Sequence, residues 1–172
     1  MPKKTTSPTP ATRKIRIGWF SFSCCEDSTV LFTELMNTHW QEWKKLFDFR
    51  HARVLQSHNV LDEMDIAFVE GAIASHEHEQ KLKEIRKMAK KLVAIGACAV
   101  AGLPSAQRNT FSEGQKQEIE FLLARFGALP KVLRLADVVR VDVEVPGCPM
   151  NPDDFMKKVT LLIQEFQQAQ TS

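Results

Sequence analysis

The amino-acid sequence predicts one α/β domain with a mainly parallel sheet. Short apolar, β-prone segments alternate along the chain with helical segments, an order typical of parallel strands joined by helices. The composition is 44% hydrophobic and 26% charged, close to the globular average, so we expect most of the chain to fold around a core. The 172 residues suit one such domain, which we place at residues 14–172, behind a flexible N-terminal tail at residues 1–13.

The charge balance and the apolar runs argue against two classes of protein. Lys and Arg total 23 against 21 Asp and Glu, which disfavours a nucleic-acid binder that works by bulk charge. The longest weakly polar run, residues 92–103, is shorter than the roughly 18 apolar residues of a membrane-spanning helix. The tail has early lysines but no apolar segment after them, unlike a secretory signal. We therefore expect no membrane span and a cytoplasmic location, at most on the cytoplasmic face of a membrane complex.

Five segments are predicted to form strands. The first alternates apolar and polar residues from Lys14 and runs into a Ser-Phe-Ser-Cys-Cys segment. The fourth, LVAIG, is short and wholly apolar, which is typical of a strand buried in a parallel sheet. The five segments are residues 14–20, 51–56, 65–71, 92–96 and 137–145.

The first two predicted helices lie between these strands. Residues 75–91 begin at Ser75, a good N-cap, and carry acidic side chains near the start and basic ones near the end, which suits the helix dipole. The first turn of that helix, HEHE at residues 76–79, is predicted to be exposed and charged rather than a metal site. Residues 28–47 have apolar side chains at helical spacing, namely Leu31, Leu35, Trp40 and Trp43.

Two further helices are predicted in the second half of the chain. Ser112 and Gln115 form a capping box that opens the third helix. Asn151 is predicted to cap the fourth, with Pro152 at its first position. Each is expected to bury an apolar face: Ile119, Leu122, Leu123 and Phe126 in the third helix, and Phe155, Val159, Leu162, Ile163 and Phe166 in the fourth.

The four cysteines all follow predicted strands. Cys24 and Cys25 come after the first strand, Cys98 comes just after the fourth, and Cys148 comes after the last. The carboxyl ends of parallel strands meet at one edge of a sheet, and ligands of such sheets bind beyond that edge. The four thiols are therefore expected to converge although they are far apart in the sequence.

Four converging thiols suit an iron–sulfur centre. A [4Fe–4S] cluster takes four thiolates, and the chain supplies four with none left over. Gly96 and Gly147 would let the backbone approach a bulky inorganic centre, and Pro149 would fix the backbone after Cys148. A structural zinc site is the alternative, although such sites usually use two short C-x(2–4)-C pairs, and this chain has one adjacent pair and two isolated cysteines.

Four segments together resemble the small, electron-transferring subunit of nickel–iron hydrogenases and the related 20-kDa iron–sulfur subunit of respiratory complex I. Their order and spacing cover nearly the whole chain after the tail, and the soluble, cytoplasmic branch of the hydrogenases is the most similar. The segments are SFSCCEDS (21–28), DIAFVEGAIAS (65–75), LVAIGACAVAGLPSAQRN (92–109) and VDVEVPGCPM (141–150).

The resemblance implies a flavodoxin-like, three-layer domain that holds one proximal [4Fe–4S] cluster. That cluster would face the nickel–iron centre of a separate large subunit, where hydrogen is oxidised or protons are reduced. Further iron–sulfur or flavin subunits are possible additional partners. Glu70 and Gly71 would lie in the loop under the cluster, and Arg108 would lie on the surface near the large subunit. The implied cluster ligands are Cys24, Cys25, Cys98 and Cys148.

The first two cysteines depart from the hydrogenase pattern. Hydrogenase small subunits place their first two ligands as C-x-x-C, whereas here Phe22 stands at the first of those positions and the ligands are adjacent. This tandem pair is similar to the complex I subunit, so a complex-I-like electron carrier without hydrogenase activity is a second interpretation. Neighbouring side chains of an extended backbone point apart, so we predict a bend and local strain at Cys24 and Cys25. Glu26 and Asp27, which follow, are expected to cap the next helix.

Overall fold

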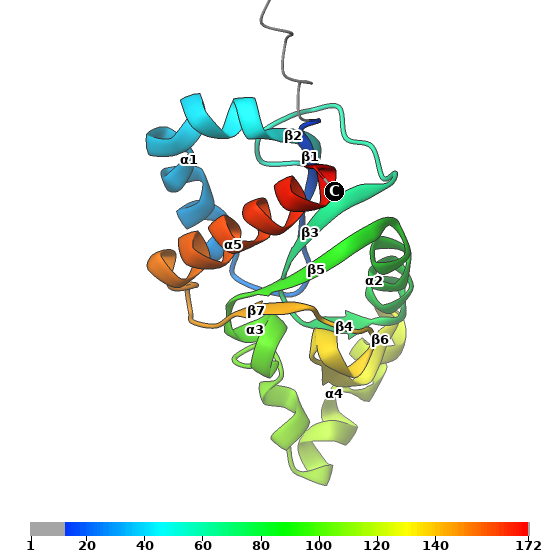
Figure 1. Cartoon of the computed structure of the whole chain (residues 1–172). Coiled ribbons are helices and arrows are strands. Elements are labelled where there is room, and N and C mark those ends of the chain that lie inside the picture. Colours follow the sequence, from blue (N-terminus) through cyan, green and yellow to red (C-terminus); the bar gives the residue numbers. More distant parts are fainter. Residues whose placement is uncertain (1–12, 172) are drawn as a thin grey trace, which may run out of the picture.

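The computed structural model describes residues 13–171 and is built around a five-stranded sheet (Figure 1). Each pair of neighbouring strands is parallel, which confirms the predicted α/β class. In spatial order the strands are β2 (Phe47–Ala52), β1 (Ile15–Ser21), β3 (Met64–Glu70), β5 (Ala89–Ile95) and β7 (Val143–Val145). Residues 1–12 of the predicted tail lie outside the described residues.

Helices cover both faces of the sheet and complete the three layers. Helices α1 (Asp27–Leu46) and α5 (Pro152–Thr171) cover one face, and α2 (His76–Met88) covers the other (Figure 1). Successive residues of β1 serve the two cores, because Trp19 packs with the α1 and α5 side and Phe20 packs with the α2 side. All seven residues of the central strand β3 are buried.

A smaller antiparallel pair extends the domain beyond the carboxyl edge of the sheet. It consists of β4 (Ile73–Ser75) and β6 (Ala128–Leu133), neither of which the sequence patterns predicted. Around it lie the short helix α3 (Gly96–Ala101) and helix α4 (Glu113–Arg125). Two 3₁₀ turns, η1 (Gln107–Thr110) and η2 (Leu135–Asp137), connect these elements.

Three predicted segments end in different places in the structure. The strand expected at residues 51–56 is instead Phe47–Ala52, because pairing with β1 begins at Phe47, and Val54 and Leu55 lie beyond the sheet, exposed. The helix expected over 75–91 ends at Met88, where pairing with β3 takes over at Ala89. Of the strand expected at 137–145, only Val143–Val145 pairs with β5.

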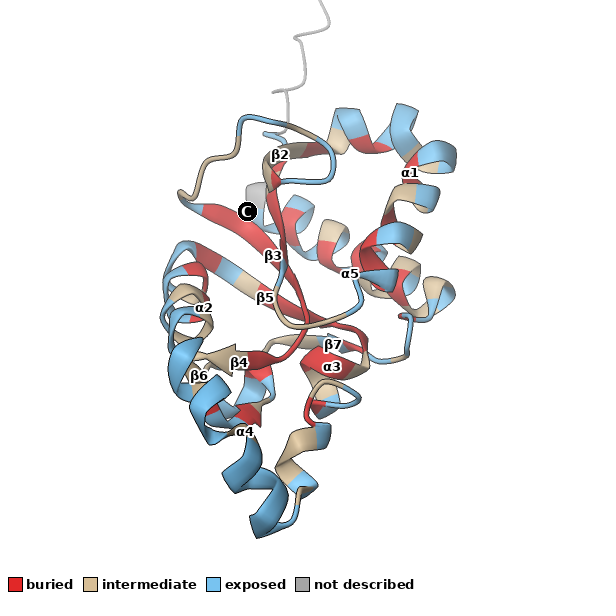
Figure 2. Ribbon diagram, turned by 180° about the vertical axis from the view of Figure 1, so that it is seen from behind, coloured by how far each residue is buried: buried red, intermediate tan, exposed pale blue. Residues whose placement is uncertain are grey.

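The prediction for helix α4 is wrong about its environment. The capping box of Ser112 and Gln115 is present and the helix forms. However, none of its residues is buried, and Phe121 and Phe126 are 65% and 70% exposed (Figure 2). The spacing of the apolar side chains correctly predicts a helix, but the described chain provides no core against which they pack. The C-terminal helix behaves as predicted: Asn151 accepts a hydrogen bond from the Asp154 amide, and four of its five predicted apolar side chains are buried, Ile163 partly so.

A buried carboxylate holds the amino edge of the sheet together. The side chain of Asp65, which is fully buried at the start of β3, accepts two hydrogen bonds from Arg13 and one from the Arg16 amide. Lys90 of β5 lies 3.0 Å away as a further ion pair. Burial alone would raise the pKa of Asp65, but the hydrogen bonds from Arg13, Arg16 and Lys90 outweigh it and lower the pKa to about 2. This cluster lies at the opposite edge from the cysteines.

Candidate metal centre

All four cysteines lie beyond the carboxyl edge of the sheet and line one hollow. Cys24 and Cys25 follow β1, Cys98 lies in the first turn of α3 after β5, and Cys148 follows β7. All four are free thiols. Strands β1, β3, β5 and β7 are consecutive in the sheet, so segments far apart in the sequence end side by side. Four other predicted site residues line the same hollow: Glu70, Gly96, Gly147 and Pro149.

Short hydrogen bonds tie the cysteine-bearing segments to one another. The Ala97 amide donates to the Gly147 carbonyl over 2.6 Å, which joins the segments of Cys98 and Cys148. Ser23 and Ala72 exchange two backbone hydrogen bonds of 3.0 and 3.1 Å, which fix the segment that precedes Cys24. The Met150 amide donates to the Ser28 hydroxyl over 3.2 Å, which ties the Cys148 segment to the start of α1.

Glycines are required at several points of this framework. Gly147 has a φ of +118°, and a Cβ there would lie 2.5 Å from the Pro149 carbonyl oxygen. Gly96 has a φ of +80° and sits against the Ser28 hydroxyl. Gly71 does not line the hollow, but its φ is +93° and a Cβ would lie 2.8 Å from the Phe22 backbone. Each therefore allows a backbone approach that a side chain would prevent.

Glu70 stabilises the helix that begins beside the cysteines. Its carboxylate, 3% exposed, accepts hydrogen bonds from the amides of Ser28 and Thr29 and from the Thr29 hydroxyl. These are two of the free amides at the start of α1, so a residue distant in sequence supplies the cap. The prediction that Glu26 caps this helix is wrong, because Glu26 occupies the N-cap position but its side chain makes no capping hydrogen bond.

The backbone bends at the adjacent cysteines, as the tandem pair led us to expect. The bend is centred on Cys24. Glu26 has a φ of +63° and is, among the described residues, the one non-glycine residue in the left-handed region. That conformation costs about 1–2 kcal/mol for a residue with a Cβ. The local strain thus lies one residue after the pair.

The electrostatics of the hollow do not suit a reactive thiol. Burial, followed by the negative charge of Glu70, raises the pKa of Cys24 to about 12. Cys24 is therefore a neutral thiol at pH 7, unlike the low-pKa cysteines that act as nucleophiles. Metal ligation requires the thiolate, so a bound centre must contribute positive charge to offset this burial.

The arrangement of the thiols favours a cluster over a single metal ion. Four thiolates on one tetrahedral zinc, each about 2.3 Å from it, would lie about 4 Å from one another. Among residues 13–171, no group of three or more His, Cys, Asp or Glu side chains is arranged to hold a metal ion. A cluster spreads its four thiolates over four irons and so accepts a wider set. The cavity is about 10 Å³, room for one water molecule, so the exposed Cys25 and Cys148 must turn outward to admit a cluster.

Arg108 is not the surface residue that the family resemblance implied. Its guanidinium donates to the carbonyls of Ala74 and Leu129, 3.2 and 2.8 Å away. These two residues belong to β4 and β6, so Arg108 helps to hold the small antiparallel pair together. Burial lowers the pKa of the guanidinium, which confirms that it lies inside rather than facing solvent. The sequence reasoning also missed Ser28, Thr29 and Ser105, because their hydroxyls act across segments that no local pattern connects.

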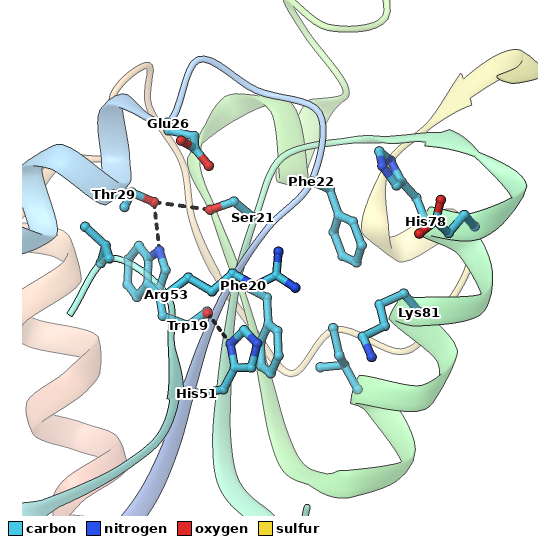
Figure 3. A pocket seen from close by; sticks show the side chains of 13 residues that line it. Trp19, Phe20, Ser21, Phe22, Glu26, Thr29, His51, Arg53, His78 and Lys81 are labelled. Carbon is cyan, nitrogen blue, oxygen red and sulfur yellow. Dashed lines mark hydrogen bonds between the residues drawn. The ribbon is translucent and has the colours of Figure 1, made fainter. Parts of the chain in front are cut away.

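A second and larger hollow lies on the other side of the segment that carries the tandem cysteines (Figure 3). Its volume is about 640 Å³, within the range of small-molecule sites. Figure 3 shows Arg53 and Lys81 directed into it from opposite walls, with His51 bonded to the Trp19 carbonyl. Burial lowers the pKa of both His51 and His78, so both rings are neutral at pH 7. Of the HEHE turn, the expected Glu79–Lys83 ion pair forms, whereas Lys81 pairs with Glu84 rather than Glu77.

Comparison with known proteins identifies similar chains. Residues 24–162 match the family described as NADH ubiquinone oxidoreductase, 20 kDa subunit. The gamma subunit of coenzyme F420 hydrogenase from Methanosarcina barkeri is 31% identical over 83% of this chain and 51% of its own length. The delta subunit of the NAD-reducing hydrogenase HoxS from Cupriavidus necator is 31% identical over 87% of this chain and 79% of its own length.

The similarity extends to three dimensions. A chain in the crystal structure of an NAD⁺-reducing [NiFe]-hydrogenase in the H₂-reduced state superposes with a TM-score of 0.75. The two chains are 29% identical, and the match covers 88% of this chain and 93% of the other. The present chain nevertheless spans only about half the length of the F420 hydrogenase relatives, 51% and 43% for the two matched most strongly. No helix among residues 13–171 has the length and apolar character needed to cross a membrane.

Proposed function

Since the chain belongs to the family of the NADH ubiquinone oxidoreductase 20 kDa subunit, we propose that it is the small subunit of a [NiFe] hydrogenase. In this proposal it holds one proximal [4Fe–4S] cluster and passes electrons between the nickel–iron centre of a large subunit and a further acceptor. The proposed ligands are Cys24, Cys25, Cys98 and Cys148. The cytoplasmic location expected from the sequence stays a prediction.

The observation that carries the proposal is the convergence of four free thiols from three strand ends in one hollow. The chain supplies no other cysteine, so the hollow uses the whole set. The printed names of the relatives, which are subunits of F420- and NAD-linked hydrogenases, support the choice of partner and reaction.

The chain's own residues would bind the cluster, hold its ligands and leave one side open. A [4Fe–4S] cluster, when bound, supplies one-electron transfer. Cys98 lies on the buried side of the hollow, whereas Cys25 and Cys148 are exposed. The exposed side is where a large subunit would cover the centre and exclude water. Glu70 fixes the start of α1, and through Ser28 it also steadies the Cys148 segment.

Metal analysis of the anaerobically purified chain tests the cluster. We expect about four irons per chain, as one cluster with four thiolate ligands requires, and a brown colour that dithionite bleaches. Cys24→Ser and Cys25→Ser should each lose the cluster or keep a three-iron remnant, whereas the neighbouring control Ser23→Ala should keep four irons. Stoichiometric zinc, or a normal four-iron spectrum in both cysteine variants, would refute this assignment of ligands.

The adjacent cysteine pair favours a second candidate, a complex-I-like electron carrier whose large partner binds no nickel. The two candidates share the cluster and differ in the partner. Purification of the chain with its large subunit, followed by nickel analysis and an assay of hydrogen-dependent dye reduction, separates them. Nickel with dye reduction supports the hydrogenase, while iron without nickel and without dye reduction supports the second candidate.

A further inference from the structure

The hydroxyl of Ser105 lies within hydrogen-bonding distance of one of the four cysteine sulfurs. Its oxygen is 3.2 Å from the Cys98 sulfur and 2.8 Å from the Ser23 carbonyl oxygen. A hydroxyl carries one proton and so donates to one of these acceptors at a time. Among residues 13–171, no other side chain donates a hydrogen bond to a cysteine sulfur. Ser105 is thus the single side-chain donor available to the proposed ligands.

The backbone holds Ser105 over the first turn of α3. That helix ends at Gly102, whose φ is +81° and whose amide donates to the Cys98 carbonyl over 3.0 Å. The chain then turns back, and the Ala106 amide donates to the Gly102 carbonyl over 2.8 Å. The position of the hydroxyl is therefore set by the same short segment that carries Cys98, and does not depend on a flexible side chain.

The surroundings of Cys98 strengthen this contact. Cys98 is 6% exposed and packs with Ala72, Ala106 and Val132, all apolar. Water therefore does not compete for the sulfur, and a hydrogen bond in such a low-dielectric site is stronger than one in solvent. A thiolate is also a much better acceptor than a thiol, because hydrogen bonds to charged atoms are about twice as strong as neutral ones.

We propose that Ser105 is a positioning residue that donates to the Cys98 thiolate and thereby raises the reduction potential of the bound cluster. This inference rests on the proposed function. One electron added to the cluster increases the negative charge on its sulfurs, so the bond from Ser105 strengthens on reduction. The proton stays on the Ser105 oxygen, and the electron is the only particle transferred. The hydrogen bond therefore favours the reduced state.

The contact with the Ser23 carbonyl gives a competing explanation, in which Ser105 only clamps two segments together. Both roles would be lost in Ser105→Ala, so stability and cluster content alone do not separate them. The potential does, because a clamp affects how much cluster is bound, whereas a donor to the sulfur changes how easily the bound cluster is reduced. Ser105→Thr keeps the hydroxyl and serves as the rescue variant.

The experiment is an anaerobic redox titration of the cluster-loaded complex, followed by the EPR signal of the reduced cluster and with iron counted in each sample. Thr110→Ala is the matched control, because its hydroxyl bonds to the Gln107 carbonyl in the same region and reaches no cysteine. At the wild-type midpoint, we expect the reduced-to-oxidised ratio in Ser105→Ala to fall about threefold to tenfold. This corresponds to a midpoint lower by about 30–60 mV, at about 59 mV per tenfold for one electron.

The outcomes separate this inference from the proposed function. A lowered potential in Ser105→Ala at four irons, with Ser105→Thr and Thr110→Ala near the wild type, supports it. An unchanged potential in Ser105→Ala at four irons overturns the role of Ser105 and leaves the cluster assignment intact. If Ser105→Ala loses its cluster, the decision falls to Ser105→Thr, whose midpoint must stay near that of the wild type. A wild-type chain that binds no four-iron cluster overturns the proposed function and this inference with it.

Discussion

Replacement of Asp65 by Asn tests whether the buried carboxylate stabilises the amino edge of the sheet. The carboxylate accepts hydrogen bonds from Arg13 and the Arg16 amide and pairs with Lys90. These contacts lower its pKa from the ordinary 3.8 to about 2. At about 1.4 kcal/mol per pH unit, the ionised form therefore stabilises the fold by roughly 2 kcal/mol, a value that allows for solvent around the two cations.

For a chain of this size, each kcal/mol moves the melting temperature by about 2–4 °C. Asp65→Asn should therefore lower the melting temperature at pH 7 by about 4–8 °C in circular dichroism. The cluster content should not change, because Asp65 lies at the edge opposite the cysteines. Asp62→Asn is the matched control: Asp62 also pairs with an arginine, Arg50, but its side chain is 39% exposed, so little stability should be lost. A melting temperature of Asp65→Asn within 2 °C of the wild type would refute the reasoning.

The same carboxylate predicts a pH dependence with a definite sign. Its folded-state pKa is lower than its unfolded-state value, so the stabilisation is complete above about pH 4 and is lost as the pH falls toward 2. The difference in unfolding free energy between the wild type and Asp65→Asn, measured by urea unfolding, should accordingly narrow over that range. A difference that stays constant from pH 7 to pH 2.5 would show that ionisation of Asp65 is not its source.

Three further substitutions probe the framework around the cysteines. Gly71→Ala would place a Cβ 2.8 Å from the Phe22 backbone at a φ of +93°, so iron content should fall sharply, whereas Gly114→Ala, with open space around it, should keep four irons and raise the melting temperature slightly. Glu70→Gln puts an amide group against the free amides of α1 and should lower the melting temperature by about 4–10 °C in thermal unfolding; no change would show that the cap contributes nothing. Glu26→Gly removes a Cβ from the left-handed region, so the melting temperature should stay level or rise by up to about 4 °C, and a fall would contradict the strain at this residue.

The sequence predicted the features that depend on local pattern or on strand order. The parallel sheet, the C-terminal helix and the gathering of four cysteines at one edge all follow from alternation, capping residues and the position of each cysteine after a strand. The extent of β2 could not be predicted, because pairing with β1 rather than β-propensity decides where it begins and ends. The exposure of α4 was also out of reach, since an apolar stripe indicates that a helix needs a partner but not that the partner lies in the same chain.

The side chains that arrange the candidate centre were the least predictable part, and the reason is physical. Glu70 caps a helix more than forty residues earlier in the chain, and Ser105 reaches Ser23 across the hollow, so both contacts exist only after the sheet has formed. Their patterns in the sequence are those of ordinary loop residues. The family resemblance placed Glu70 near the cluster but not its role, and it placed Arg108 on a surface where the structure has a buried guanidinium.

The tandem cysteines, the left-handed Glu26 and the cap from Glu70 form one mechanical unit. Adjacent ligands require the backbone to turn sharply, and the turn leaves Glu26 at a φ of +63°, immediately before α1 begins. The strain is tolerated because the next two amides are held by the carboxylate of Glu70, through hydrogen bonds of 3.1 and 3.0 Å. Hydrogen bonds to a charged group contribute about 1.5–3 kcal/mol each, more than the roughly 1–2 kcal/mol of the left-handed residue. A spaced C-x-x-C pair would not need this turn, so we infer that the buried glutamate helps this chain to keep adjacent ligands.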